Sequence, residues 1–493
     1  MKSLVLAEKP SVARDIARVL KCGKSLNGAM EGQEYIVTWG LGHLVTLADP
    51  EDYHPRYKEW KMEDLPMLPD EFKLEVIKQT GKQYNAVKTQ LYRNDVKDII
   101  IATDAGREGE LVARLILKKA GSRKPIRRLW ISSITDNAIR EGFAHLKDGR
   151  EYDNLYDAAM CRAEADWMVG INATRALTCK YNAQLSCGRV QTPTLAMIAR
   201  REEEIRQFVP IPYFGIRGES RQPALTLTWQ DGGSKSARSF DRKRIEELVQ
   251  GLQGKQGVVE DVKRTPKKTY APLLYDLTEL QRDANKRFGY SAKETLNIMQ
   301  RLYENHKVLT YPRTDSRYLS ADIVPTLKER LRACGTGPYK KLAGRLTGRP
   351  LPEKLFFVDN GRVSDHHAII PTEQFVQLDH MTVDERRIYD LVVRRFLAVL
   401  YPPFEYEQTA LTVKAGNECF TARGEIVKAS GWREAYENER EEEEDAEGEE
   451  QDVKAQKLPD IKKGDILSSI TFRMTEGKTK PPSPFNEATL LSA

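Results

Sequence analysis

The 493-residue chain is poor in cysteine and has no long apolar run. Its six cysteines are scattered, and no two of them form a Cys-x-x-Cys pair. Neither a zinc ribbon nor a disulfide framework is indicated, so we expect reduced thiols in the cytoplasm. No apolar stretch approaches the roughly 18 residues that cross a bilayer, and no cationic leader precedes the first strand pattern. We therefore expect no membrane contact.

Apart from one strongly acidic segment, the chain has fewer acidic than basic residues. Residues 434–452 contain twelve carboxylates and one arginine, a charge of −11, so a net charge of +6 leaves +17 on the rest. Such a balance favours a polyanionic partner such as nucleic acid, although a basic surface can also serve solubility alone. The acidic run is predicted to be a disordered loop, and a nucleic-acid mimic that screens a binding cleft is the alternative.

Two strand patterns in the N-terminal part are each followed by a turn and a helix pattern. Residues 3–7 precede a helix that begins near Pro10, and residues 98–103 precede the turn 104–110 and a second helix. Ligands of an open α/β sheet collect outside the carboxyl ends of its strands. The acids that follow these two strands are therefore expected to converge.

The acids at these turns are Glu8, Asp104 and Glu108. Hard carboxylate oxygens clustered in this way suit Mg²⁺, which would relieve their mutual repulsion. The alternative is that they are first-turn acids that complement helix dipoles.

Residues 308–319 place Tyr311 next to Pro312 and Arg313. Proline cannot continue a helix, so Tyr311 is expected at a bend. Arg313 and Arg317 can bind phosphate oxygens and are expected to favour the phenolate form of Tyr311. A half-buried tyrosine with surface arginines is the alternative, because short motifs often match by chance.

Five motifs occur in a fixed order along the chain. They are Glu8-Lys9-Pro10-Ser11, the turn Asp104 to Glu110, Ser186-Cys187-Gly188-Arg189-Val190-Gln191-Thr192-Pro193, Thr310-Tyr311-Pro312-Arg313-Thr314-Asp315-Ser316 and Asp365-His366-His367-Ala368-Ile369-Ile370-Pro371. In this order they resemble the type IA DNA topoisomerases, and within that family the topoisomerase III branch of Gram-positive bacteria. The resemblance covers nearly the whole chain.

The resemblance implies a multidomain α/β, α and β fold, with a Rossmann-like Toprim domain and a toroidal arch. We expect the Toprim domain at 1–152 and a helical DNA-cleft domain at 153–209 and 474–493. A β-rich arch at 210–272 and 401–473 would flank a helical domain at 273–400 that carries Tyr311. The final residues match only the start of the returning cleft segment, so that second part is expected to be truncated.

The resemblance also implies the catalytic roles. Tyr311 would attack a phosphodiester of single-stranded DNA and leave a 5′-phosphotyrosine and a free 3′-hydroxyl, without a nucleotide cofactor. Glu8 would move the proton of the departing oxygen, and Lys9 and Arg313 would bind the phosphate. His366 would bond the same phosphate or support an acid, and His367 could exchange roles with it.

Mg²⁺ would be held by Asp104 and Glu108 with Glu8 nearby, and would align the broken ends for resealing. The family pattern Asp-x-Asp-x-Glu has Gly106 in place of its second aspartate. We interpret this as a lineage feature that weakens or alters metal binding.

Candidate DNA contacts lie mainly after residue 153. Residues 156–170 are predicted to be helical, with Arg162 and Asp166 at i and i+4 and able to pair. The following loop, 184–193, supplies further candidates for phosphate and sugar contacts. The full set of candidates is Arg162, Asp166, Ser186, Arg189, Gln191, Arg317 and His367.

The chain is therefore expected to be a monomeric, nucleoid-associated enzyme that relaxes negatively supercoiled DNA and decatenates DNA, with a helicase as a possible partner. The alternative from another class is a truncated single-stranded-DNA-binding core with little or no strand passage. A primase or nuclease would explain the three acids but leaves Tyr311, Arg313 and His366 without a role.

Overall fold

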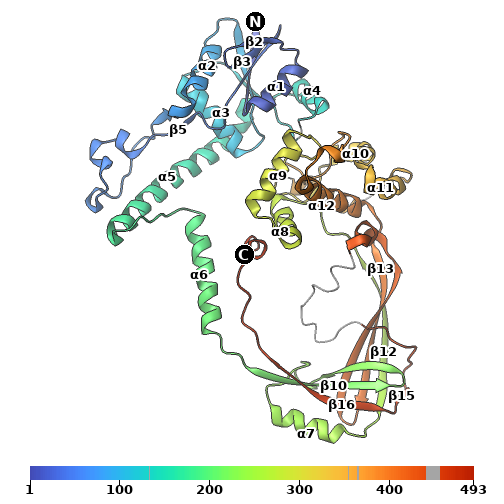
Figure 1. Cartoon of the computed structure of the whole chain (residues 1–493). Helices are drawn as coiled ribbons and strands as arrows, with labels where there is room; N and C mark the ends of the chain where they lie inside the picture. Colours follow the sequence, from blue (N-terminus) through green and yellow to red (C-terminus); the bar gives the residue numbers. More distant parts are fainter. Residues whose placement is uncertain (133, 353–354, 364–365, 440–455) are drawn as a thin grey trace.

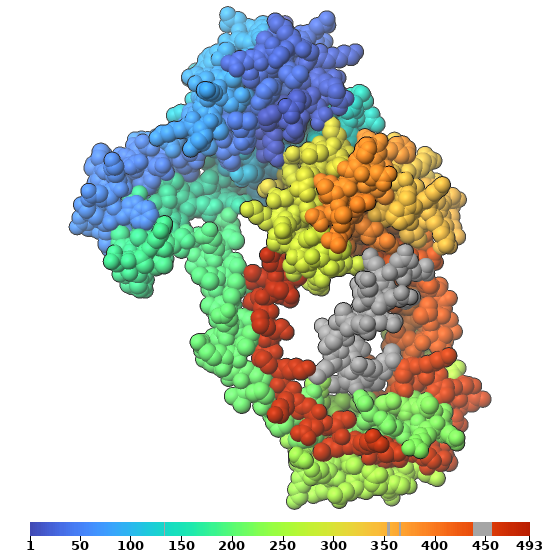
Figure 2. All heavy atoms as spheres, in the orientation of Figure 1, coloured from blue at the N-terminus to red at the C-terminus, as the bar shows by residue number. Residues whose placement is uncertain are grey.

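The computed structural model describes residues 1–132, 134–352, 355–363, 366–439 and 456–493. The chain forms a ring in which an N-terminal α/β unit touches a helical unit, and a β-rich arch lies at the far side (Figure 1). Figure 2 shows an opening through the molecule between these parts. Residues 440–455 hold most of the acidic run, so the predictions of a disordered loop and of a mimic concern residues outside the described part.

The α/β unit is built on one sheet with β1, the first strand of the chain, at its centre. In spatial order the strands are β2 (Lys24–Leu26), β3 (Ala29–Glu31), β4 (Tyr35–Trp39), β1 (Lys2–Ala7), β7 (Val96–Ala102), β8 (Ile126–Arg128) and β9 (Lys147–Asp148). β1 pairs in parallel with β4 and β7, and β7 pairs in parallel with β8. A separate antiparallel pair, β5 (Val45–Leu47) and β6 (Leu74–Val76), lies beside it.

Helices cover both faces of this sheet, because successive residues of β1 point to opposite sides. Leu4 and Leu6 belong to the core shared with α2 (Gly81–Leu91) and α3 (Arg107–Ala120). Val5 and Ala7 belong to the core shared with α1 (Pro10–Val19) and α4 (Asp136–Ala144). The predicted Rossmann-like α/β fold is confirmed, as are the helix that begins at Pro10 and the strand near residues 98–103.

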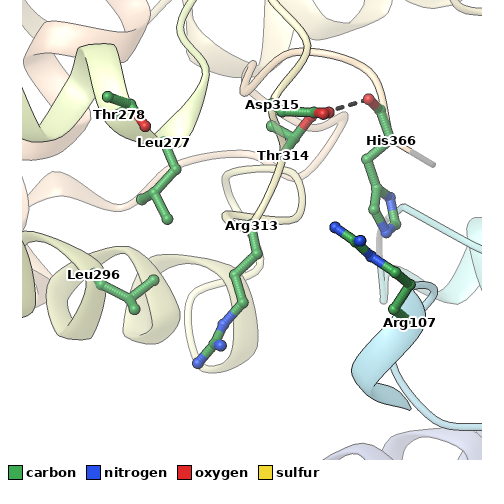
Figure 3. A pocket seen from close by; sticks show the side chains of 8 residues that line it. All are labelled: Arg107, Leu277, Thr278, Leu296, Arg313, Thr314, Asp315 and His366. Atoms are coloured by element: carbon green, nitrogen blue, oxygen red, sulfur yellow. Dashed lines mark hydrogen bonds between the residues drawn. The ribbon is translucent and has the colours of Figure 1, made fainter. Parts of the chain in front are cut away.

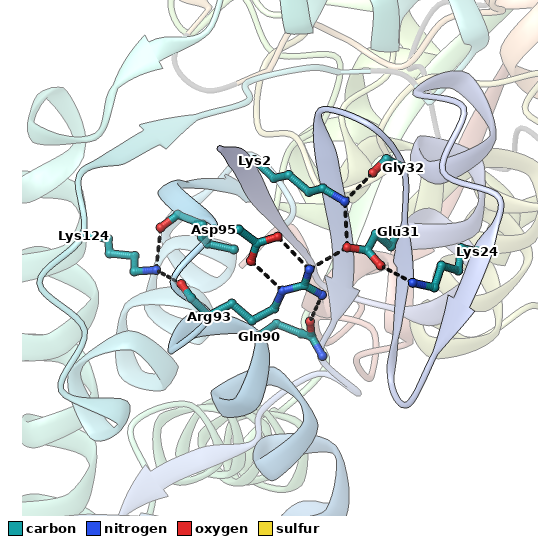
Figure 4. Close-up of polar contacts among 9 residues, drawn as sticks. Lys2, Lys24, Glu31, Gly32, Gln90, Arg93, Asp95 and Lys124 are labelled. Atoms are coloured by element: carbon teal, nitrogen blue, oxygen red, sulfur yellow. Dashed lines mark hydrogen bonds and ion pairs between the residues drawn. The ribbon is translucent and has the colours of Figure 1, made fainter.

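The edge of the sheet where the parallel strands begin is held by a charged network (Figure 4). Glu31 is buried and accepts hydrogen bonds from Lys2 at 2.7 Å, Lys24 at 3.1 Å and Arg93 at 2.6 Å. These bonds lower the pKa of Glu31 to about 2, and the bond from Lys2 has the largest effect. Arg93 also binds Asp95 at 2.8 Å. The carboxylates at this edge are matched by cations, so the network ties β1, β3 and the start of β7 together.

The arch is a single antiparallel sheet made from two distant parts of the chain. In spatial order its strands are β15 (Ile466–Leu467), β12 (Gly257–Thr269), β13 (Phe404–Ala415), β14 (Glu418–Ala429), β11 (Ala224–Gln230), β10 (Pro212–Arg221) and β16 (Ile470–Lys478). α7 (Arg242–Leu252) packs against β10 and β16. Trp229 is fully buried in the core of the arch. The strand predicted at residues 224–229 is confirmed by β11.

In the sequence, the helical unit lies between the two segments that form the arch. Its helices are α8 (Leu277–Phe288), α9 (Ala292–Glu304), α10 (Leu327–Cys334), α11 (Lys340–Thr347) and α12 (Val383–Leu400). α8 and α9 confirm the two predicted amphipathic helices, and a capping box of Ser291 and Glu294 begins α9. The short helix α14 (Glu487–Leu490) contacts α8, and Glu487 accepts a hydrogen bond from the backbone N–H of Ala292 at 2.5 Å.

Two helices connect the α/β unit to the arch: α5 (Asp153–Tyr181) and α6 (Gln191–Gln207). The predicted pair of Arg162 with Asp166 is wrong, because Asp166 accepts a hydrogen bond from Arg189 at 2.8 Å across the intervening loop. Gln191 begins α6 instead of lying in the loop, since a proline two residues later is tolerated in a first helical turn.

Two further observations concern whole-chain properties. All six cysteines are free, as predicted. In the part of the chain that the structure describes, no helix combines the length and apolar character that a membrane span requires.

Candidate active site

Two acids meet at the carboxyl ends of β1 and β7. Ala7 and Ala102 are neighbours in the parallel ladder, so the residues that follow them leave the sheet side by side. The backbone N–H of Asp104 donates to Oε2 of Glu8 at 3.1 Å. The turn is tight: a Cβ at Gly109 would lie 2.0 Å from the carbonyl oxygen of Asp104, so glycine is required there. The structure thus brings Glu8 and Asp104 together.

Glu108, the third predicted acid, lies in the first turn of α3 but turns elsewhere. Its Oε1 contacts Nε2 of His43 at 2.7 Å. This bond lowers the pKa of Glu108 and raises that of His43. His43 is a partner that the sequence motifs did not single out.

Tyr311 reaches these acids from the helical unit. Its side chain is 7% exposed, and its Oη lies 3.4 Å from Oδ2 of Asp104. Its backbone N–H donates to the carbonyl of Ser132 in the α/β unit at 3.0 Å. The ring packs against His366, with centroids 4.3 Å apart, and against the edge of Tyr303 at 5.5 Å. The phenol is therefore held inside the joint between the two units.

The charges around the phenol oppose its ionisation. Burial first, and then the carboxylates of Asp104 and Glu8, raise the pKa of Tyr311 well above its ordinary value, and Arg313 only partly counters them. Arg313 thus favours the phenolate as expected, but burial and the two carboxylates outweigh it, and the phenol stays protonated. Burial and Glu8 likewise raise the pKa of Asp104 above its ordinary value. Asp104 is therefore a candidate for proton exchange with the phenol.

The two predicted phosphate-binding cations have different surroundings. Lys9 forms an ion pair with Glu304 of α9 at 2.8 Å. Burial alone would lower the pKa of Lys9, but Glu304 and the nearby Asp104 and Glu8 outweigh it and raise the pKa. Arg313 is exposed beside the tyrosine. One cation is therefore engaged across the joint and the other faces solvent.

Further polar contacts close the same joint. Lys307 pairs with Asp15 at 2.6 Å, and the hydroxyl of Thr135 donates to Glu373 at 2.5 Å. Each contact joins the α/β unit to the helical unit, so these ion pairs and hydrogen bonds stabilise the closed arrangement around Tyr311.

The two histidines are buried and have different partners. Nδ1 of His366 contacts the hydroxyl of Ser132 at 2.9 Å, and its Nε2 contacts the backbone carbonyl of Ala105. His367 contacts the carbonyl of Ala368 at 2.7 Å. Burial lowers the pKa of each ring to about 4, so both are neutral near pH 7. His366 thus lies in the joint against Tyr311, and His367 is enclosed in the helical unit.

The acids fit a divalent cation in part. Asp104 is half-buried beside Glu8, and desolvation first and the charge of Glu8 second raise its pKa. A hard dication bound by these oxygens would relieve that repulsion. Glu108 could join them only after release from His43, and Gly106 offers no ligand. Among the described residues, no cluster of three or more metal-ligating side chains is already assembled.

A cavity of about 350 Å³ opens beside His366, whose ring packs against Tyr311 (Figure 3). Its lining residues come from both units: Arg107, Leu277, Thr278, Leu296, Arg313, Thr314, Asp315 and His366. The hydroxyl of Thr314 donates to the carbonyl of His366 at 2.9 Å and closes one side. Arg107, which belongs to the turn motif, was not among the predicted site residues.

The remaining predicted DNA contacts are distributed over separate places. Arg162 and Ser186 are exposed on α5 and the loop after it, and Gln191 is exposed at the start of α6. Arg317 donates to the carbonyl of Leu274 at 3.2 Å within the helical unit. The structure therefore does not gather this set at the tyrosine. Sequence motifs also gave no signal for Glu304, whose pairing with Lys9 joins residues far apart in the chain.

The sequence is similar to known proteins over nearly the whole chain. The DNA topoisomerase family pattern matches residues 150–493, and the Toprim domain pattern matches residues 3–134. DNA topoisomerase 3 of Bacillus cereus is 62% identical over 492 residues, which cover 100% of this chain and 67% of that protein. The corresponding protein of Bacillus subtilis is 59% identical with the same coverage.

The solved structure of full-length topoisomerase I from Thermotoga maritima superposes with a TM-score of 0.72. The superposed region covers 99% of this chain and 74% of the Thermotoga chain, at 24% sequence identity. This similarity supports the fold. Two family patterns, close relatives over the whole length and a shared ring architecture lead to one assignment. The chain belongs to the type IA DNA topoisomerases and carries a Toprim domain.

Proposed function

We propose that this chain cleaves one strand of DNA through Tyr311, allows strand passage and reseals the break. Relaxation of negatively supercoiled DNA and decatenation would follow from this cycle. The observation that carries the proposal is the position of the Tyr311 hydroxyl, 3.4 Å from Asp104 in the acidic joint. A tyrosine and a proton-accepting carboxyl group in contact are the parts that nucleophilic attack on a phosphodiester needs.

The chemical step is a transesterification. Oη of Tyr311 forms a bond to phosphorus while the bond from phosphorus to the 3′ oxygen breaks, and the phenol proton passes to Asp104. Glu8, bonded to the backbone of Asp104 at 3.1 Å, enters the step as the neutral acid and gives its proton to the departing 3′ oxygen. The two carboxyl groups together hold one proton before the step, on Glu8, and one proton after it, on Asp104. Arg313 and Lys9 neutralise charge that develops on the phosphate, and Lys9 must leave Glu304 to do so. Resealing is the reverse reaction.

The covalent phosphotyrosine conserves the energy of the broken ester, so no nucleotide cofactor is required. Mg²⁺ held by Asp104 and Glu8, with Glu108 after it releases His43, would supply charge that aligns the broken ends. All the groups named above come from one chain, so we propose a monomer as the active form. Chromosomal and plasmid DNA in the bacterial cytoplasm would be its substrate.

The test combines a single-stranded oligonucleotide with negatively supercoiled plasmid, each with Mg²⁺. Wild-type protein should give a covalent protein–DNA adduct on a denaturing gel and should relax the plasmid. Tyr311→Phe should give neither product. Tyr303→Phe is the matched control, because it removes the hydroxyl of the neighbouring buried tyrosine and should leave adduct formation intact.

An adduct that persists in Tyr311→Phe would refute the assignment of the nucleophile. Adduct formation without plasmid relaxation would instead favour a binding and cleavage core that does not complete strand passage.

A further inference from the structure

Trp130 follows β8 in the α/β unit and contacts the helical unit across the joint. Its indole ring is nearly parallel to the imidazole of His366, with 12° between the planes and 6.2 Å between the centroids, an offset stack that stabilises two flat rings. The imidazole packs in turn against Tyr311, with centroids 4.3 Å apart. We propose that Trp130 is a positioning residue, which holds the imidazole of His366 flat against the phenol of Tyr311. This role rests on the proposed cleavage at Tyr311.

His366 takes its orientation from the α/β unit, although it belongs to the helical unit. Burial lowers the pKa of His366 to about 4, so the ring is neutral and has one N–H. A carbonyl oxygen only accepts, so Nε2 donates to Ala105, and Nδ1 accepts from the hydroxyl of Ser132 at 2.9 Å. Two bonds at the ring nitrogens define a line, and the ring can still rotate about that line. The parallel indole of Trp130 blocks this rotation.

The indole of Trp130 is itself held by the α/β unit. It stacks on Tyr152, with centroids 4.8 Å apart and 24° between the planes. The guanidinium carbon of Arg128 lies 5.1 Å from the centroid of the indole. Arg128 is fully buried and donates to the carbonyls of Thr103 and Asp104 at 2.8 and 2.7 Å. The indole is therefore attached to the same part of the α/β unit that holds Asp104.

These contacts tie the position of the nucleophile to that of its proton acceptor. Oη of Tyr311 lies 3.4 Å from Oδ2 of Asp104, and proton transfer depends on this approach. If the imidazole tilts, the phenol that packs on it can move away from the carboxyl group. A small displacement of reacting atoms lowers the rate of a chemical step strongly. Loss of the indole should therefore slow the attack on DNA without weakening DNA binding.

The experiment measures single-turnover adduct formation on a labelled single-stranded oligonucleotide with Mg²⁺ and saturating protein. Trp130→Leu keeps a large apolar side chain at this half-buried position but removes the flat face. It should lower the rate constant about three- to tenfold, the worth of one aromatic stack. The dissociation constant for the same DNA, measured in a Tyr311→Phe background, should not change. Trp130→Phe keeps a flat ring and should restore the rate constant to within about twofold of wild type.

Three further variants separate positioning from a loss of stability. Tyr152→Leu removes the ring that stacks on the indole and should lower the rate constant about twofold. In a His366→Ala background, Trp130→Leu should cause no further loss, because the indole acts through the imidazole.

Trp432→Leu is the matched control. Trp432 lies in η10 (Gly431–Glu439), away from the joint, and donates to the carbonyl of Thr269 at 2.9 Å. Its loss should lower the fraction of folded, reactive molecules, which sets the amplitude of the reaction, and leave the rate constant unchanged.

The possible outcomes separate two hypotheses. If the indole and Tyr152 variants change only the amplitude or only the DNA affinity, or if the loss in Trp130→Leu persists in full beside His366→Ala, the positioning role is wrong and cleavage at Tyr311 stands. If wild-type protein forms no adduct with the oligonucleotide, the proposed function itself fails.

Discussion

The two edges of the N-terminal sheet shift the pKa values of their carboxyl groups in opposite directions. Where the parallel strands begin, Glu31 is surrounded by three cations and its pKa is lowered to about 2 (Figure 4). Where they end, Asp104 is half-buried beside Glu8 and its pKa is raised by desolvation and by Glu8. The first edge stabilises the folded chain. The second holds charge at a cost in stability, which is typical of a place where chemistry occurs.

The largest expected effect comes from Asp104→Asn. Without its proton acceptor, Tyr311 should form the DNA adduct roughly 10²- to 10⁴-fold more slowly. The same change removes the repulsion between Asp104 and Glu8, so the metal-free protein at neutral pH should become more stable by roughly 1–2 kcal/mol. Adduct kinetics and denaturant unfolding in the presence of a chelator measure the two effects. A destabilised variant would contradict the contrast between the two edges.

Glu31→Gln should do the reverse. We expect it to lower the free energy of unfolding by roughly 2–3 kcal/mol, because three cations lose their shared partner. Adduct formation per folded molecule should not change. The pKa of Glu31 is lower in the folded chain than its ordinary value of 4.5, so the stability it supplies is present above that pH and is lost toward about pH 2.

Urea unfolding of both proteins across this acid range tests the sign of that linkage. The difference between wild type and Glu31→Gln should shrink as the pH falls. A difference that stays constant would show that ionisation of Glu31 is not the cause.

A smaller effect is expected from Glu304→Gln, which frees Lys9 for phosphate. In a Tyr311→Phe background, single-stranded DNA should bind about three- to fivefold more tightly. The reason is that the partly exposed ion pair of Lys9 with Glu304 no longer competes with the DNA phosphate for Lys9. Fluorescence anisotropy in a chelator measures the affinity. Glu373→Gln removes another acid that crosses the joint but pairs with Thr135, and serves as the control. Equal affinities of the two variants would count against competition at Lys9.

The smallest effect is expected from Gly106→Asp, which adds a third acid near Glu8 and Asp104. No atom lies within 4 Å of a Cβ built at Gly106, and its φ of 178° is extended backbone that any residue adopts. The Mg²⁺ concentration that half-activates plasmid relaxation should fall about two- to fivefold. Gly106→Asn has the same size without the charge. If both variants keep the wild-type midpoint, the glycine does not weaken metal binding.

Local patterns predicted the features that depend on neighbouring residues. The strand-to-helix turns placed Glu8 and Asp104 correctly because parallel strands end at the same edge of a sheet. The helices α8 and α9 followed from their apolar spacing, and Pro312 correctly placed Tyr311 outside a helix. The ordered motifs added the ring architecture, which periodicity alone does not give.

Features that depend on burial and on distant contacts were not predictable in this way. Arginines next to Tyr311 suggested a phenolate, but the depth of the joint and two carboxylates from the other unit decide its protonation. The pair of Arg162 with Asp166 was plausible on an isolated helix, yet a loop residue competes successfully for the aspartate. Likewise, the partner of Glu108 is a histidine 65 residues away.

The backbone bond from Tyr311 to Ser132 has a consequence for the safety of the genome. In the proposed reaction, the phenol of Tyr311 and its proton acceptor Asp104 belong to opposite sides of this joint. Separation of the two units would then also separate the nucleophile from its proton acceptor, so DNA would be cleaved only while the joint is closed on a strand.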